Sequence, residues 1–482
     1  MHSVTDTSSH TQRLAQLACG YTWSDAPEDV RHRLLLAVRD TLACGIAGSA
    51  TSLSLMHRRT AGSLPNGRST VLGYCDATSP QVAAFQNATA MNAMDFDDTA
   101  SVSGHPGAPI LAAALAVAEQ QGASGVELLQ AVLAGYEVAA RVAIACRPSP
   151  EQYALVHGSQ CFLGFGAAAA AARVLTLNEE ATARAFGIVA ALTPIPVAGK
   201  FGWEEGRISW IKDNVNWPSE AGVRAAYLAK EGFPASTTVF DGDRGFWRMI
   251  ASDRFEADQL VDATTFHLRD LAFKPYPCCR WLHASLEAVK AALDQAGGRN
   301  VEKITIWTTR GVAASFGAKR PATMIDAQFS APHAVAALCL GIAVNEWWRE
   351  DLLVDPAFQK MMDRVTLKED ATMTLQFLET GRNVNRIPAR ALVEFADGQS
   401  FEAFCPFPQG TPSSDRAKSR SDDAMLAEKH RQLLKVRFSE DSVEKFWHTV
   451  EQLANAPDLT LLSEVLRQVR GPTPRGDLDA NE

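Results

Sequence analysis

One short segment of this sequence holds several side chains that can move protons. It reads Met94-Asp95-Phe96-Asp97-Asp98-Thr99, and Gly104-His105-Pro106 follows after a short gap. The stretches on either side are apolar and rich in alanine, so we expect these polar groups to be buried. A carboxylate that orients an imidazole is a common device in acid–base catalysis. The segment predicts a proton-transfer site at the end of a buried helix, the alternative being a helix end with exposed acids.

The spacing within this segment adds a geometric expectation. On a helix, Asp98 and Thr99 lie three and four residues from Asp95, so all three would share one face. His105 follows a glycine-containing turn and could fold back towards that face. We therefore take Asp95 and His105 as catalytic candidates and Thr99 as a hydrogen-bond donor to substrate.

Two further groups are candidates for proton transfer. His157 lies just before an alanine-rich helical stretch, where a structural role is the alternative. Lys212 lies between Trp210 and Trp217 with few other cations nearby. Half-burial lowers the pKa of a lysine towards neutrality and makes it a useful proton donor. A structural pair with Asp213 explains Lys212 equally well.

A proline-rich loop is a candidate for binding carboxylates. In Lys274-Pro275-Tyr276-Pro277-Cys278-Cys279-Arg280-Trp281-Leu282-His283 the prolines fix an extended backbone. Lys274 and Arg280 flank that loop, and His283 begins a helix whose N-terminus favours anions. The alternative is a rigid turn with solvated cations. His333 begins another alanine-rich helix, where it serves either the site or the core.

Composition excludes several classes of function. The 482 residues carry a formal net charge of −9 and no basic cluster, which argues against nucleic acid and anionic membranes as partners. No uncharged apolar run reaches the length of a membrane span, and no secretory signal is visible. The nine cysteines form no C-x-x-C pair, which is typical of reduced thiols in a cytoplasmic protein. Nucleotide-binding and metal-binding motifs are absent, so we expect no cofactor and no metal.

The periodicity of the chain predicts a mainly α protein. Helix start signals and apolar stripes at helical spacing recur through the first half, and the six alanines at 167–172 favour close helix packing. After about residue 268 the pattern changes, since 301–308 and 391–403 alternate with period two, the latter around the turn Asp397-Gly398. Helical stretches at 283–296 and 327–344 accompany these strands. Residues 406–423 look like a linker, and helical periodicity returns after 423. We expect a helical bundle domain built from both chain ends, with an inserted α+β lid domain: 1–267 and 409–482 for the first, 268–408 for the second.

These segments together resemble the MmgE/PrpD family, which includes 2-methylcitrate dehydratase, cis-aconitate decarboxylase and iminodisuccinate epimerase. The resemblance runs from about residue 30 to residue 460, in the family's order. Besides the segments at 94–106 and 274–283, it is carried by Gly135-Tyr136-Glu137-Val138 with Arg141, His157 before Gly164-Phe165-Gly166, Lys212-Asp213 through Trp217, and Asp326-Ala327-Gln328-Phe329-Ser330 with Pro332. Any one of these is weak evidence, whereas six in order are strong.

The resemblance implies a cleft between bundle and lid, a homodimer and a small di- or tricarboxylate substrate. The family's active-site pattern would fall on Asp95, Thr99, His105, His157, Lys212 and His283. Two positions depart from it, because His333 stands where many members have tyrosine and Gly158 where proline is frequent. An imidazole can carry charge near neutral pH where a phenol does not.

The family reactions share one chemical problem, which is a carbanion-like centre next to a carboxylate. We expect His105 and His157 to transfer protons, Lys212 to protonate a leaving hydroxyl or the carbon, and Lys274, Arg280 and His283 to bind carboxylates. The leading hypothesis is a cofactor-independent lyase that dehydrates a hydroxy-tricarboxylate such as 2-methylcitrate. Decarboxylation or epimerisation at the same site is the second, and His333 favours the epimerase. A non-catalytic polycarboxylate binder is the third.

Overall fold

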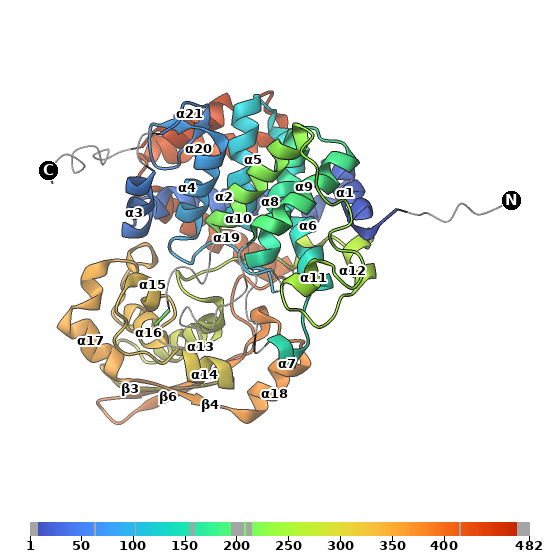
Figure 1. Cartoon of the computed structure of the whole chain (residues 1–482). Coiled ribbons are helices and arrows are strands. Elements are labelled where there is room, and N and C mark those ends of the chain that lie inside the picture. The colour runs from blue at the N-terminus through green and yellow to red at the C-terminus, as the bar shows by residue number, and fades with distance from the viewer. Residues whose placement is uncertain are drawn as a thin grey trace.

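The computed structural model of the chain describes residues 8–61, 64–101, 103–153, 155, 160–193, 207–208, 215–413 and 416–469. Helices dominate it, which confirms the expectation of a mainly α protein (Figure 1). The described part of the chain before the proline-rich loop contains α1 (His10–Gly20), α2 (Glu28–Gly48), α3 (Ser52–Thr60), α4 (Pro80–Asn92), α5 (Gly107–Gln121), α6 (Gly125–Ala145), α7 (Pro150–Tyr153), α8 (Gln160–Val174), α9 (Glu179–Leu192), α10 (Asn216–Lys230), α11 (Phe246–Met249) and α12 (Ala257–Val261), with the small hairpin β1 (Ser69–Thr70) and β2 (Ala77–Thr78).

Small residues allow the central helices to approach closely. The Gly166 position of α8 faces Gly135 of α6, and a Cβ on Gly166 would lie 2.7 Å from the Gly135 carbonyl oxygen. The six alanines of α8 are buried, as the sequence predicts for a helix at the centre of a bundle. Ser124 begins α6 with a capping box to Glu127, which satisfies backbone donors that the helix leaves free.

The helix α6 is also long and apolar enough to span a membrane, and α2 with α3 would pass the same test as a bent pair. The apolar window of α6 is 89% buried inside the molecule. It also holds the buried ion pair between Arg141 and Glu137. Both features are expected of a helix in a protein core.

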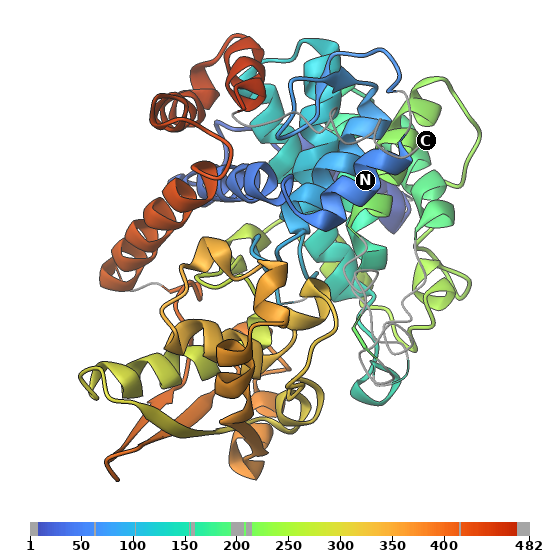
Figure 2. The ribbon, with the colours of Figure 1, turned by 90° about the vertical axis from the view of Figure 1, so that its left-hand side faces the viewer.

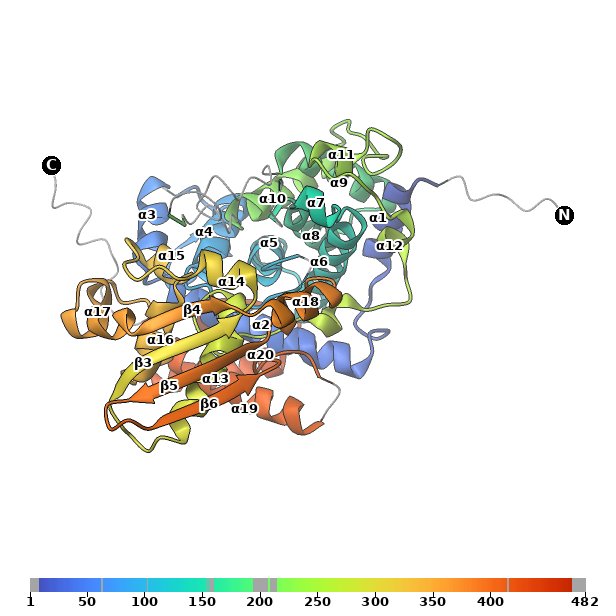
Figure 3. The same ribbon diagram turned by 90° about the horizontal axis from the view of Figure 1, so that it is seen from below.

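The second part of the chain forms an α+β region with its own core. It contains α13 (His283–Asp294), β3 (Val301–Thr308), α14 (Arg310–Ser315), α15 (Met324–Ala327), α16 (Ala331–Cys339), α17 (Pro356–Asp363), β4 (Val365–Glu369), α18 (Ala371–Glu379), β5 (Ala389–Phe395) and β6 (Ser400–Cys405). The sheet order is β4-β3-β5-β6, with β3 and β4 parallel and the other pairs antiparallel. Helices α13 and α16 cover one face of this sheet, as Figure 3 shows.

The chain then returns to the helical body through α19 (Arg416–Leu434), α20 (Glu440–Glu451) and α21 (Thr460–Arg467). Leu433, Phe446 and Leu462 belong to the same buried cluster as Leu34 of α2. Figure 2 shows these last helices in red beside the helical body. The predicted linker is therefore wrong in its second half, because α19 already begins at Arg416. The domain boundaries at 267/268 and 408/409 stay a prediction.

Short 3-10 turns complete the connections. They are η3 (His267–Asp270), η4 (Arg280–Leu282), η5 (Val344–Glu346), η6 (Glu350–Leu353), η7 (Val384–Arg386) and η8 (Leu453–Asn455). Two of them, η3 and η4, bracket the proline-rich loop. That loop carries the chain from the helical body into the α+β region.

Candidate active site

The acidic segment is an irregular loop between α4 and α5. The helix α4 ends at Asn92, and Asp95 adopts a left-handed backbone with φ of 50°. The expectation that Asp95, Asp98 and Thr99 share one helical face is therefore wrong. Aspartate is among the few residues that tolerate this conformation. The turn brings two carboxylates, rather than one, against the same imidazole.

His105 lies between those carboxylates. Its Nε2 is 3.2 Å from Asp95 Oδ1, and its Nδ1 is 3.4 Å from Asp97 Oδ1. The Nδ1 atom is also 3.0 Å from the carbonyl oxygen of Asp98, which can only accept, so Nδ1 carries a proton. The proton that His105 can give and retake is then the one on Nε2. The predicted association of Asp95 with His105 is present, while the contribution of Asp97 was missed.

The ammonium of Lys274 contacts the same oxygen of Asp95 as His105 does. Its Nζ donates to Asp95 Oδ1 and to the Asp95 carbonyl oxygen, each at 2.8 Å, and the side chain is fully buried. Burial alone would lower the pKa of Lys274, but the carboxylates of Asp95 and Asp97 outweigh it and raise that pKa. Lys274 is thus a fixed positive charge beside the proton-transfer pair.

A third buried acid, Asp98, belongs to the same loop. Asp98 accepts hydrogen bonds from the Tyr136 hydroxyl and from the Gly107 backbone N–H, the latter at 3.0 Å. Burial, with the charge of Asp97, raises the pKa of Asp98 to about 7 in spite of these donors. Asp98 therefore changes its protonation state close to neutral pH.

Thr99 connects the loop to the segment that enters the α+β region. Its backbone N–H donates to the Ala272 carbonyl oxygen at 2.9 Å, and the Ala272 N–H donates back at 2.8 Å. The loop is held a second time from that region, since Gln328 Nε2 donates to the Ala93 carbonyl oxygen at 2.8 Å. A hydrogen bond from the Thr99 hydroxyl to substrate stays a prediction.

Arg280 joins the two segments that link the α+β region to the helical body. Its guanidinium donates to the carbonyl oxygens of Phe273, before the region, and Gln409, after it, at 3.4 and 2.9 Å. It also donates to Thr411 Oγ1 at 2.7 Å. Burial lowers the pKa of Arg280 to about 10, which still leaves the side chain charged at neutral pH. Carboxylate binding by Arg280 stays a prediction. Its contacts show a structural role that the sequence did not suggest, because Arg280 acts as a clamp between the two linking segments.

The other two predicted histidines lie in the α+β region. His283 is fully buried, with Nε2 3.1 Å from the Cys278 carbonyl oxygen and Nδ1 3.3 Å from Arg280. Burial and then the Arg280 charge place the pKa of His283 well below its ordinary value. The one N–H of this neutral imidazole donates to the Cys278 carbonyl oxygen, and Nδ1 accepts from Arg280. Carboxylate binding by His283 therefore stays a prediction that these contacts do not favour.

His333 packs on Phe358, and its Nε2 is 3.2 Å from the Trp347 carbonyl oxygen. Burial lowers the pKa of His333 to about 4. The expectation that this imidazole differs from a tyrosine by carrying charge near neutral pH is therefore wrong. His333 gives no electrostatic reason to favour the epimerase.

Two predicted catalytic residues, His157 and Lys212, lie outside the described residues. Their roles stay predictions from the sequence. What the structure assembles is the remaining part of the site, formed by Asp95, Asp97, His105 and Lys274.

The same cluster has donors that could reach one metal ion. One ligand atom from each of Asp95, Asp97 and His105 lies within 4.8 Å of the others. Two carboxylates and an imidazole suit several divalent cations. The Lys274 ammonium already provides positive charge at Asp95. The expectation that the site works without a metal ion stays a prediction, and removal of metal from the protein tests it.

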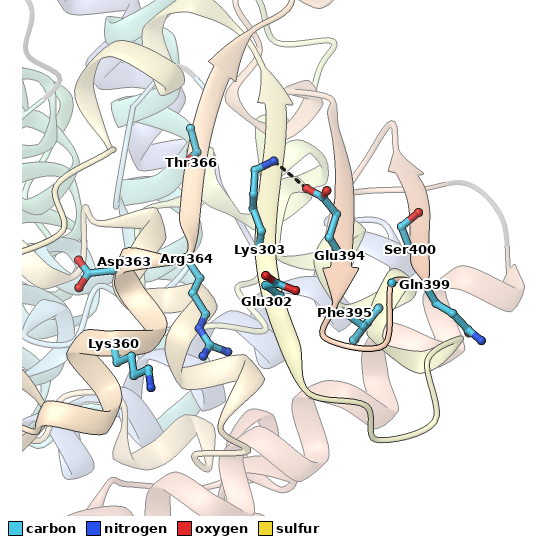
Figure 4. Close-up of a pocket in the computed structure, with 11 residues that line it drawn as sticks. Glu302, Lys303, Lys360, Asp363, Arg364, Thr366, Glu394, Phe395, Gln399 and Ser400 are labelled. Atoms are coloured by element: carbon cyan, nitrogen blue, oxygen red, sulfur yellow. Dashed lines mark ion pairs between the residues drawn. The ribbon is translucent and has the colours of Figure 1, made fainter.

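An open hollow of about 630 Å³ lies elsewhere, on the sheet of the α+β region (Figure 4). It carries charges of both signs, and Lys303 pairs there with Glu394 at 2.9 Å. Asp363 is held by Arg320, also at 2.9 Å. None of the predicted site residues lines this hollow, so it gives no support for an active site on the sheet.

The fold and the site together define a class of protein, namely a helical body with an α+β region and a buried acid–base cluster where the two meet. Residues 12–258 match the MmgE/PrpD N-terminal domain and residues 276–455 the MmgE/PrpD C-terminal domain. The chain therefore belongs to the MmgE/PrpD family, as its motifs indicate.

Curated relatives match over nearly the whole chain. A cis-aconitate decarboxylase-like protein, oryM of Aspergillus oryzae, is 25% identical over 93% of this chain and 94% of its own length. The cis-aconitate decarboxylase of Aspergillus terreus is 23% identical over 95% of each chain. The human cis-aconitate decarboxylase is 24% identical over 96% of this chain and 95% of its own.

Proposed function

We propose that this protein is a lyase that decarboxylates cis-aconitate or a closely similar tricarboxylate. The observation that carries the proposal is the position of His105, between two carboxylates and beside the Lys274 ammonium. The names of its relatives support decarboxylation over the dehydration of 2-methylcitrate that the sequence put first. They give no support to an isomerase.

The chemistry of decarboxylation requires two things of the site. When a carboxylate on a saturated carbon leaves as CO2, its bonding pair stays on carbon and spreads through the neighbouring double bond towards another carboxylate. One proton must then be added to carbon, so the substrate loses CO2 and gains H⁺. Fixed positive charge stabilises the intermediate, and a positioned acid supplies the proton.

The described residues can meet both requirements. His105 would deliver the proton from Nε2, with Asp95 holding that nitrogen and the Asp98 carbonyl oxygen holding Nδ1. Lys274 would keep Asp95 ionised and add positive potential for the substrate carboxylates. Thr99 would hydrogen-bond the substrate, while His157 and Lys212 would complete the acid–base set. Arg280 would orient a carboxylate from the side of the α+β region, and His283 would help to hold Arg280 by accepting from its guanidinium.

The α+β region would act as a lid over this site, and the protein would work as a cytoplasmic homodimer without metal or cofactor. Two sets of contacts support the lid: Arg280 joins the two segments that link the α+β region to the helical body, and the Thr99–Ala272 pair ties the first of these segments to the site loop. Light scattering of the purified protein tests the dimer. A monomer at micromolar concentration would remove that part of the proposal.

The experiment that separates the candidate reactions is NMR in deuterated water with a panel of polycarboxylates. We expect CO2 release from cis-aconitate with deuterium added to carbon. Water loss from 2-methylcitrate with no turnover of cis-aconitate would make the protein a dehydratase. Proton exchange alone would point to an isomerase, and silence across the panel to a binder.

A further inference from the structure

A second buried ammonium, besides that of Lys274, contacts the site loop. Lys429 of α19 is 4% exposed, and its Nζ donates to the carbonyl oxygen of Phe96 at 2.7 Å. The same nitrogen lies 4.1 Å from the centroid of the Phe96 ring. Phe96 is the residue between Asp95 and Asp97, so Lys429 holds the peptide that joins the two carboxylates of the site.

The two lysines donate to consecutive backbone carbonyl groups, and the first of these belongs to the residue with the left-handed backbone conformation. Lys274 donates to the Asp95 carbonyl oxygen and Lys429 to the Phe96 carbonyl oxygen. Asp95 has the left-handed φ of 50°, which aspartate tolerates better than most residues with a Cβ but which is still an uncommon backbone conformation. Charged donors make stronger hydrogen bonds than neutral ones, and both of these are shielded from water.

Lys429 is itself fixed by acid from another helix. Its Nζ is 2.6 Å from Asp40 Oδ1 of α2, and His430 Nε2 is 2.9 Å from the same oxygen. Burial would raise the pKa of Asp40, but Lys429 and His430 outweigh it and keep the carboxylate ionised. The position of the ammonium is therefore set by α2 and α19 and does not depend on the substrate.

We propose that Lys429 is a positioning residue for the active site. By holding the Phe96 carbonyl, it fixes the turn that places Asp95 and Asp97 on either side of His105. It acts through the backbone, by its hydrogen bond to the Phe96 carbonyl oxygen. The role of Lys429 in fixing the turn is argued from its contacts alone. The effect of Lys429 on turnover rests on the proposed function.

The test compares Lys429→Met with His430→Gln. Both substitutions remove one partner of Asp40, but only the first removes the donor to Phe96, so His430→Gln is the matched control for a loss of stability. We expect Lys429→Met to lower kcat on cis-aconitate by about 10- to 100-fold with a small change in KM, as expected for misplacement of a reacting group. His430→Gln should keep kcat near that of the wild type, and Lys429→Arg should restore part of the loss.

A second measurement needs no substrate and so separates this proposal from the proposed function. In protein labelled with ¹⁵N-histidine, the ring signals of His105 are identified by their loss in His105→Gln. We expect these signals to move in Lys429→Met and to stay in place in His430→Gln. Because Lys429→Met leaves the Asp40 charge buried without its ammonium, the comparison is repeated with Asp40→Asn/Lys429→Met against Asp40→Asn. Unmoved His105 signals in the folded Lys429 variants, or equal losses of kcat in Lys429→Met and His430→Gln, would overturn the proposal.

Discussion

His105 takes its chemical character from backbone as much as from side chains. The sequence supports the pairing of Asp95 with His105, because an acidic run and a histidine flank a glycine-containing turn. It does not reveal the role of Asp97, since Asp97 reaches His105 only through the left-handed turn at Asp95. Neither does it reveal Lys429, whose contact with Phe96 spans most of the chain. Local spacing predicts neighbours within a helix, whereas these contacts depend on tertiary packing.

Asp98 should make stability depend on pH. Its pKa is raised to about 7 in the folded protein from 3.8 in the unfolded chain. Stability from this group is therefore fully present below about pH 4 and is lost as the pH rises through 7. In Asp98→Asn the position cannot ionise, so we expect stability relative to the wild type to increase between pH 4 and 8, by about 1.4 kcal/mol per unit of raised pKa.

Urea unfolding at several pH values measures this difference. The exposed substitution Asp25→Asn is the control and should leave the pH slope unchanged. A constant difference between Asp98→Asn and the wild type across this range would show that Asp98 is ionised throughout.

Metal removal tests whether the cluster works by side chains alone. We expect turnover of cis-aconitate to survive dialysis against EDTA and to gain nothing from added Mg²⁺, Mn²⁺ or Zn²⁺. The Lys274 ammonium already supplies positive charge at Asp95. Loss of activity with EDTA and its return with one cation would assign Asp95, Asp97 and His105 to that metal instead.

At the scale of elements, the sequence predicts best where side-chain pattern alone decides the structure. The strand at 301–308 and the hairpin around Asp397 and Gly398 form as expected, with φ of 81° at Gly398. The helix expected over 327–344 is shorter, since α16 covers Ala331–Cys339. The loops between elements depend on distant partners, and Arg280 shows this most clearly.

Replacing Arg280 tests its role as a clamp between Phe273 and Gln409. Arg280→Met leaves several buried acceptors without a donor, each worth about 1–3 kcal/mol. We expect the free energy of unfolding to fall by at least about 3 kcal/mol. The matched surface change Arg310→Met, at an exposed ion pair, should cost less than about 1 kcal/mol. If urea unfolding gave equally small losses of unfolding free energy for Arg280→Met and Arg310→Met, the contacts of Arg280 would not stabilise the junction between the two regions.

At the scale of the whole molecule, the last three helices complete the core of the helical body. The helices α19–α21 return after the α+β region and supply Leu433, Phe446 and Leu462 to the core of the helical body. The sequence predicts this return from the renewed helical periodicity after residue 423. The extent to which α19 is buried could not be predicted, because it depends on contacts with α2, which lies almost 400 residues earlier in the sequence.

Phe446→Ala tests this dependence of the body on the chain end. The ring is fully buried, and its removal should cost about 3–5 kcal/mol by urea unfolding. Lys445→Ala, an exposed position on the same helix, is the control and should cost less than about 1 kcal/mol. A loss below about 1 kcal/mol for Phe446→Ala would mean that α20 is peripheral to the core.

The most direct test of the central claim is the ratio of deuterium incorporated at carbon to CO2 released from cis-aconitate in deuterated water. For the wild type we expect one deuterium per CO2, and for His105→Gln a rate at least about 100-fold lower with the fold intact by circular dichroism. No CO2 from the wild type, or a near-normal rate in folded His105→Gln, would contradict the assignment of this cluster to proton transfer in a decarboxylase.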